Sequence, residues 1–118
     1  MADAPISHYS FGRIIIGGGT YTSDVIIFPD RVNSHWRRQQ GHLLTPGDLA
    51  EVVGAAPGLL IIGTGNSGLM KVPAETVAFL KAQGIEVEIL PTAAAADAYN
   101  RAYSEGEAMV VGAFHLTC

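Results

Sequence analysis

An unbroken aliphatic run, Leu59-Leu60-Ile61-Ile62, leads directly into the glycine-rich loop Gly63-Thr64-Gly65-Asn66-Ser67-Gly68, and this pair of features constrains the fold most. A strand exposed on one face alternates apolar and polar residues, whereas a continuous apolar run is typical of a strand buried on both faces. Such strands belong to parallel sheets that helices cover on both sides. The run therefore predicts an α/β domain.

From residue 45 onward, helix and strand signals alternate. Thr45, Pro46 and Asp48 form a helix start, in which Thr45 caps, Pro46 suits the first turn and Asp48 can reach back as a capping-box acid. Strands joined by single helices run parallel through right-handed crossovers. Two helices are predicted over residues 45–54 and 73–83, and Thr92 can cap a third. The predicted strands cover residues 59–62, 85–90 and 108–114.

The first third of the chain reads as β structure. Residues 13–16 are rich in isoleucine, three glycines follow at 17–19, and residues 20–28 are again rich in Thr, Tyr, Val and Ile. This pattern predicts a hairpin, which either extends the parallel sheet or packs on it as a separate layer. Residues 32–37 are a candidate for a third, shorter strand.

Composition limits the classes of function. The 118 residues fit one domain, 1–118, and the 48% hydrophobic content supplies a real core. Charged residues make up 15%, which favours partial burial of the surface in a homo-oligomer or in a complex with a protein partner. The net charge of −4 disfavours nucleic acid as a partner, and the apolar runs are too short to cross a membrane.

Cysteine content and the first residues predict a cytoplasmic location. The single cysteine, Cys118, rules out an internal disulfide and suits a reducing compartment. Residues 1–5 show neither the basic nor the apolar region of a signal or transit peptide.

The glycine loop matches the spacing G-x-G-x-x-G, which in dinucleotide-binding folds lets a pyrophosphate approach a helix N-terminus. Two departures weaken that interpretation: the loop follows the first helix, and the next helix begins only at Pro73. A tight turn at the carboxyl end of a strand is the simpler interpretation. Ligands nevertheless gather at that end of a parallel sheet, so a pocket for an anion or another small ligand is the alternative. The candidate pocket residues are Gly63, Thr64, Gly65, Ser67, Gly68 and Lys71, where Lys71 either holds an anion or is a solvated lysine.

A basic and aromatic cluster lies between Arg31 and Arg38 and includes His35. Tryptophan and arginine are enriched in protein–protein hot spots, and they also stack on single-stranded nucleic acid. Three arginines are few for nucleic-acid binding by an acidic protein. We therefore expect Trp36, Arg37 and Arg38 to contact a protein partner.

The four histidines, His8, His35, His42 and His115, show no metal-ligand spacing with the cysteine or with an acidic cluster. His115 and Cys118 are three residues apart, but a catalytic Cys–His pair needs a rigid setting that a chain end rarely supplies. The sequence therefore predicts no metal ligand, no cofactor and no catalytic residue.

Several short motifs together resemble the adipogenesis-associated domain family. That family includes small bacterial and archaeal proteins of unknown function, an animal adipogenesis-associated protein and a mitochondrial assembly factor for respiratory complex I. The motifs are Tyr9-Ser10-Phe11-Gly12, residues 21–29, Trp36-Arg37, Gly41-His42, residues 62–70 and His115-Leu116-Thr117-Cys118.

The resemblance implies a three-layer α/β fold with a mixed central sheet and the hairpin packed beside it. It implies roles in assembly and protein interaction and supplies no catalytic residues. We therefore expect a non-enzymatic protein-interaction or assembly-support domain. The alternative is a binder of a small ligand, such as an anion or nucleotide, or an enzyme, that uses the loop at residues 63–68.

Overall fold

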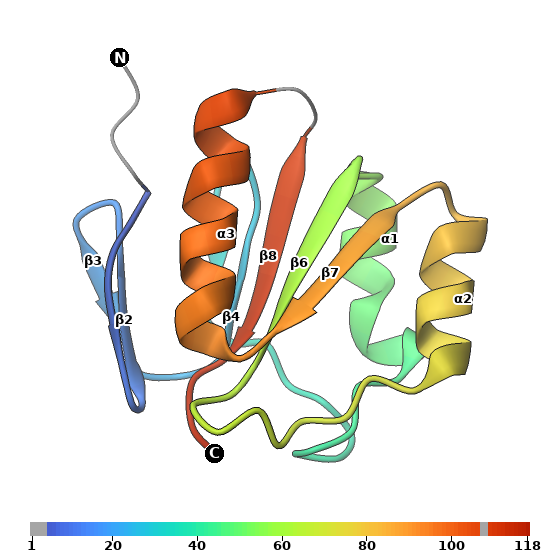
Figure 1. Cartoon of the computed structure of the whole chain (residues 1–118), viewed down its shortest axis with the longest axis horizontal. Coiled ribbons are helices and arrows are strands. Elements are labelled where there is room, and N and C mark those ends of the chain that lie inside the picture. The colour runs from blue at the N-terminus through green and yellow to red at the C-terminus, as the bar shows by residue number, and fades with distance from the viewer. Residues whose placement is uncertain (1–4, 107–108) are drawn as a thin grey trace.

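A computed structural model describes residues 5–106 and 109–118. Its centre is a five-stranded sheet in the order β5-β4-β8-β6-β7 (Figure 1). Strands β6, β7 and β8 run parallel to one another, while β4 runs antiparallel to β8 and β5 antiparallel to β4. The strands are β4 (Val25–Ile27), β5 (Val32–Asn33), β6 (Leu59–Thr64), β7 (Glu86–Leu90) and β8 (Val110–His115).

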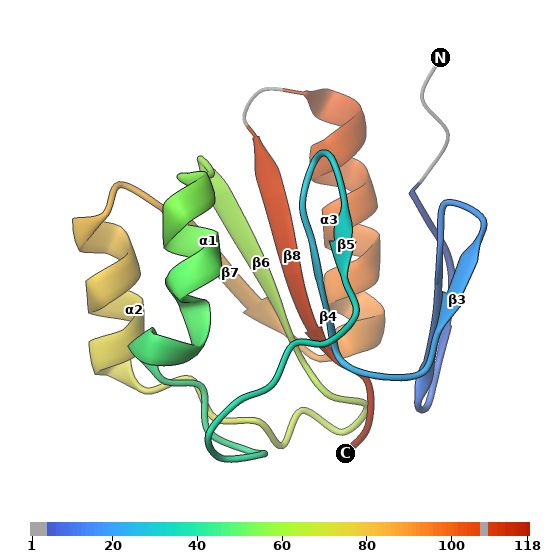
Figure 2. The same ribbon diagram turned by 180° about the vertical axis from the view of Figure 1, so that it is seen from behind.

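Helices cover both faces of this sheet, as the continuous apolar strand predicted. The 3-10 helix η1 (Pro46–Leu49), α1 (Ala50–Ala55) and α2 (Ala74–Ala82) lie on one face, and α3 (Thr92–Glu105) lies on the other (Figures 1 and 2). Within β6, Leu60 and Ile62 pack toward α1 and α2, whereas Ile61 packs toward α3. All three side chains are fully buried, so the two-sided burial and the α/β class are confirmed.

A separate three-stranded antiparallel sheet packs beside α3 (Figure 1). Its strands are β1 (Ile6–Ser10), β2 (Arg13–Ile16) and β3 (Gly19–Tyr21). The Asn100 side chain of α3 holds this small sheet in place. Its amide oxygen accepts a hydrogen bond from the Ile6 amide at 3.0 Å, and its amide nitrogen donates one to the Ile6 carbonyl at 2.7 Å. The hairpin beside a mixed central sheet is thus confirmed as a layer of its own.

Several predicted strand boundaries were wrong. The predicted strand 20–28 is divided, because the chain passes from the small sheet to the central sheet between Tyr21 and Val25, and β1 was not predicted at all. The predicted strand 32–37 stops at Asn33, whose side-chain oxygen accepts a hydrogen bond from the His35 amide and turns the chain. The last strand extends to His115, and residue 108 lies outside the described residues.

The predicted helix start at Thr45 is confirmed, although its first turn is 3-10. The Asp48 carboxylate accepts a hydrogen bond from the Thr45 amide at 2.9 Å, which satisfies a donor that the helix leaves free. None of the helices in the described part of the chain is both long enough and apolar enough to cross a membrane.

Candidate functional site

The carboxyl ends of β6, β7 and β8 meet at one edge of the central sheet, which we call the carboxyl edge (lower edge in Figure 1). Thr64, the last residue of β6, lies directly opposite His115, the last residue of β8. The glycine loop begins within β6, at Gly63 and Thr64, and continues past its end, and residues 116–118 follow β8. Because β4 is antiparallel, it begins at this same edge, directly after Asp24.

Thr92 joins the glycine loop to the end of β8. Its hydroxyl accepts a hydrogen bond from the Gly65 amide at 2.8 Å and donates one to the His115 carbonyl at 2.6 Å. Thr92 was predicted to cap α3, but the helix begins at Thr92 itself, after Pro91. The buried hydroxyl is therefore used to hold two strand ends together.

The glycine loop is packed against residues 116–118. Gly65 has φ of 108°, and a Cβ there would lie 2.5 Å from the Thr117 carbonyl oxygen and 3.0 Å from that of Cys118. The Asn66 amide donates to the Thr117 carbonyl at 3.3 Å and the Leu69 amide to the Cys118 carbonyl at 3.4 Å. Glycine is needed because another part of the backbone approaches closely.

Most of the other predicted pocket residues are also engaged within the protein. A Cβ at Gly63 would meet the Phe114 ring at 2.6 Å, and the Thr64 hydroxyl donates to the Leu90 carbonyl at 3.1 Å. The amides of Gly68 and Met70 donate to the Gly65 and Thr64 carbonyls. The side chains of Ser67 and Lys71 are exposed. The loop thus has few free amides for an anion, in contrast to a phosphate-binding loop.

Behind the loop, three charged or titratable side chains lie together: Arg38 and His115 are buried, with 5% and 7% of the side chain exposed, and Asp24 is largely buried, with 18% exposed. The Asp24 carboxylate lies 2.8 Å from His115 Nδ1 and 2.9 Å from Arg38 Nη2, and it accepts a hydrogen bond from the Leu116 amide at 2.8 Å. Nδ1 also lies 3.0 Å from Arg38 Nη2. Since an ionised carboxylate can only accept, we assign a proton to His115 Nδ1, so that Asp24 accepts from both groups and the approach of Nη2 to Nδ1 is a contact between two donors.

The surroundings keep Asp24 ionised. Burial raises its pKa, but hydrogen bonds from the Leu116 amide and His115, with the charge of Arg38, outweigh burial and lower the pKa below its usual value. The sequence does not link Asp24 with Arg38, because the two residues come from separate loops. Ser23-Asp24 at the start of a buried strand was the available signal.

The three residues predicted to contact a partner, Trp36, Arg37 and Arg38, differ in how far they are exposed. Trp36 is 7% exposed and its indole N–H donates to the Asp48 carbonyl at 3.0 Å. The side chain of Arg38 is 5% exposed, lies 4.8 Å from the Trp36 ring centroid and donates to the Gly41 carbonyl. Arg37 alone of the three is exposed. Two of these residues therefore build the interior, since the chain turns after Asn33 and does not continue as a strand.

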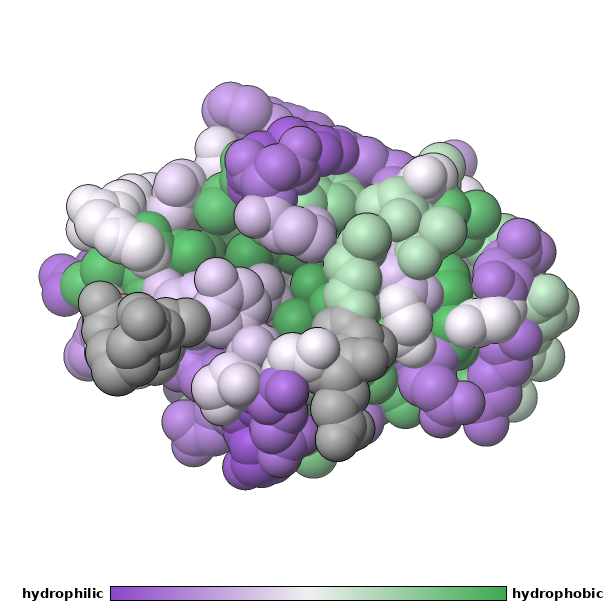
Figure 3. All heavy atoms as spheres, turned by 90° about the horizontal axis from the view of Figure 1, so that it is seen from above, coloured by the Kyte–Doolittle hydropathy of each residue, from purple (hydrophilic) through white to green (hydrophobic). Residues whose placement is uncertain are grey.

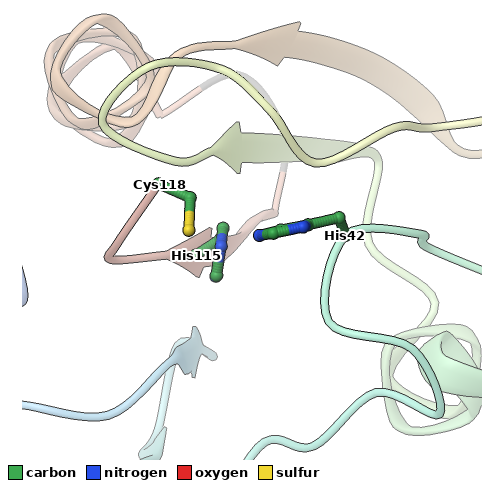
Figure 4. Close-up of side chains that lie close together, drawn as sticks. All are labelled: His42, His115 and Cys118. Atoms are coloured by element: carbon green, nitrogen blue, oxygen red, sulfur yellow. The ribbon is translucent and has the colours of Figure 1, made fainter.

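His42 and Cys118 complete the carboxyl edge. Their side chains point toward His115 (Figure 4), and the rings of His42 and His115 meet edge to face with centroids 5.8 Å apart. The nitrogen and sulfur atoms that the three residues can offer all lie within 4.8 Å of one another. The sequence predicted no such cluster, because His42 lies in a distant loop.

The opposite edge of the sheet, where β8 begins, has a different character. We call it the amino edge. An apolar groove of about 370 Å³ opens there between the end of α3 and the start of β8. Figure 3 looks onto this edge and shows apolar surface reaching the exterior between polar patches. The groove is lined by Pro29, Tyr99, Tyr103, Gly106, Met109 and Val110.

Known proteins share this architecture along nearly the whole chain. The family described as "Protein of unknown function (DUF498/DUF598)" matches residues 6–115. A protein from Bordetella parapertussis is 32% identical, with a TM-score of 0.78 and 92% of each chain covered. A Mth938-like domain from Bordetella pertussis is 25% identical, with a TM-score of 0.76, covering 96% of this chain and 85% of that one.

A conserved hypothetical protein from Pyrococcus horikoshii has the same fold at a lower sequence identity. It is 23% identical, with a TM-score of 0.79, and the match covers 96% of this chain and 98% of the archaeal chain.

Proposed function

Because the chain belongs to the DUF498/DUF598 family, which corresponds to the adipogenesis-associated, Mth938-like domain, we propose that it is a non-enzymatic domain that binds a protein partner at its amino edge. The observation that carries this proposal is the apolar groove between α3 and β8. A cytoplasmic location, where the single thiol stays reduced, fits this role.

The groove offers the chemistry of an interaction hot spot. Tyr103 and Met109 are 41% and 45% exposed, although both are large apolar or aromatic side chains. Tyr103 stacks on the buried Tyr99 ring, with centroids 6.3 Å apart and an angle of 22° between the ring planes. Aromatic residues in a preformed hollow are typical anchors for a partner's side chain.

Charge at the rim indicates the kind of partner. Glu105 precedes the lining residue Gly106, and Asp30 follows the lining residue Pro29; both are exposed, and Asp30 also forms a surface ion pair with Arg31. The chain as a whole has a net charge of −4. We therefore expect an amphipathic protein segment that inserts a large apolar side chain and carries Lys or Arg beside it.

The predicted alternative, an anion or nucleotide site in the glycine loop, receives less support. The amides of Asn66, Gly68, Leu69 and Met70 all donate to backbone carbonyls of the protein, so an anion would have to displace those hydrogen bonds. We therefore do not assign the loop to a nucleotide.

A peptide-display selection on the purified chain tests the proposal. Selected peptides should share an aromatic or aliphatic anchor next to basic residues, and Tyr103→Glu should abolish their binding. Ile89→Glu is the matched control, because Ile89 is also 41% exposed but lies on β7, outside the groove. Equal binding by the two variants would contradict the proposal. Light scattering distinguishes a partner peptide from a second copy of this chain as the occupant.

A further inference from the structure

The donor atoms of His42, His115 and Cys118 converge at the carboxyl edge from two separate segments (Figure 4). They lie within 4.8 Å of one another. In a tetrahedral zinc site, bonds of about 2.0–2.1 Å to nitrogen and 2.3 Å to sulfur place neighbouring ligand atoms roughly 3.4–3.6 Å apart. The three donors are thus close to ligand spacing, and rotation of the exposed His42 side chain can close the difference.

His115 offers a ring nitrogen that the described residues leave unused. Its side chain is 7% exposed, and among the described residues its Nε2 has no hydrogen-bond partner. A buried polar atom without a partner is costly and calls for an explanation. The hydrogen bond from Nδ1 to Asp24 leaves the lone pair on Nε2, which is the carboxylate–histidine arrangement found behind metal ligands.

Cys118 is held in place by the glycine loop. The amides of Asn66 and Leu69 bind the carbonyls of Thr117 and Cys118, and the Tyr9 hydroxyl donates to the Leu116 carbonyl at 2.8 Å. The absence of a side chain at Gly65 lets these carbonyls come close. Residues 116–118 are therefore anchored on both sides, and this anchoring supplies the rigid setting that the sequence did not predict.

We propose that His42, His115 and Cys118 form a zinc-binding site. Two imidazoles and one thiolate suit Zn²⁺, whereas Mg²⁺ and Ca²⁺ require oxygen ligands. Binding replaces the Cys118 S–H bond with a Zn–S bond and releases that proton to solvent. Three protein ligands leave a fourth position for water or an external ligand, in contrast to the closed four-ligand sites that only stabilise a fold.

The binding measurement uses the full chain without an affinity tag, stripped of metal by a chelator and kept reduced. Zn²⁺ is titrated in competition with a chromogenic chelator, and Co²⁺ serves as a spectroscopic probe. We expect one Zn²⁺ per chain. With Co²⁺ we expect a thiolate-to-cobalt charge-transfer band together with the visible absorption of tetrahedral cobalt.

Variants separate this site from adventitious binding. Cys118→Ser should remove the charge-transfer band, and both it and His42→Ala should weaken zinc binding about tenfold or more. Asp24→Asn should weaken it by about 10–100-fold through the orientation of His115. His35→Ala is the matched control, because His35 is an exposed histidine of the same connecting segment outside the cluster.

The proposal is overturned if the unmodified chain binds no zinc, or if His42→Ala and Cys118→Ser bind it as tightly as His35→Ala. Thermal melting of each variant establishes that it is folded. His42 is exposed and Cys118 partly so, which lets these two variants decide the question even where Asp24→Asn fails to fold. Tyr103→Glu should bind zinc normally, so the two proposals fail or succeed separately.

Discussion

The two edges of the central sheet contrast in how they are built. At the carboxyl edge, hydrogen bonds and a buried ion pair tie together the start of β4, the end of β8, the glycine loop and the start of α3. At the amino edge, large apolar side chains line an open groove. Changes at the carboxyl edge should therefore cost stability, whereas changes at the amino edge should affect binding and leave the fold intact.

The largest effect is expected from Asp24→Ala. This variant leaves the Arg38 guanidinium buried without its carboxylate and removes the acceptor of the Leu116 amide. Breaking a buried pair in this way should lower the free energy of unfolding by about 3–5 kcal/mol. Urea denaturation measures the change. Glu51→Gln is the control: its ion pair with Arg31 is exposed, so a comparable loss there would remove the distinction between buried and surface charge.

A slightly smaller loss is expected from Gly65→Ala. The alanine would have to adopt a positive φ that disfavours any side chain, and its Cβ would collide with the Thr117 and Cys118 carbonyls. Together these effects should cost about 2–4 kcal/mol. Gly54→Ala is the matched control, because Gly54 lies in α1 with open space around it and should gain up to about 1 kcal/mol. If urea denaturation shows no loss of stability for Gly65→Ala, the loop does not anchor residues 116–118.

Thr92→Val tests the cross-link between the loop and β8. Valine keeps the shape but leaves the buried Gly65 amide without its acceptor and the His115 carbonyl without its donor. The expected loss is about 1–3 kcal/mol, measured by the same denaturation. Thr20→Val, at an exposed position of β3, should change stability much less. Equal losses would mean that Thr92 acts through packing rather than through its hydroxyl.

Sequence patterns predicted the fold well because its signals are local. The run 59–62 indicated burial on both faces, and Pro46 and Asp48 marked a helix start. The division of residues 20–28 between two sheets could not be predicted, since both halves have the same β propensity and the break depends on packing.

The carboxyl-edge cluster depended on distant parts of the chain and was therefore missed. Asp24, Arg38, His42 and His115 approach one another only once β4 and β8 have paired. The glycine spacing was detected but resembled a phosphate-binding motif, because both situations require close approach to a bare backbone. Here the approaching atoms are the carbonyls of Thr117 and Cys118.

The smallest effect on stability is expected at the amino edge. Tyr103 is 41% exposed, so Tyr103→Glu should change the free energy of unfolding by only about 0.5–1 kcal/mol, mostly through lost stacking on Tyr99. Tyr99→Ala, which removes a buried ring from the same pair, should cost about 3–5 kcal/mol. If denaturation instead shows a large loss for Tyr103→Glu, the groove wall is part of the core. Tyr103 would then be needed for folding, and its partial exposure would no longer support the groove as a binding surface.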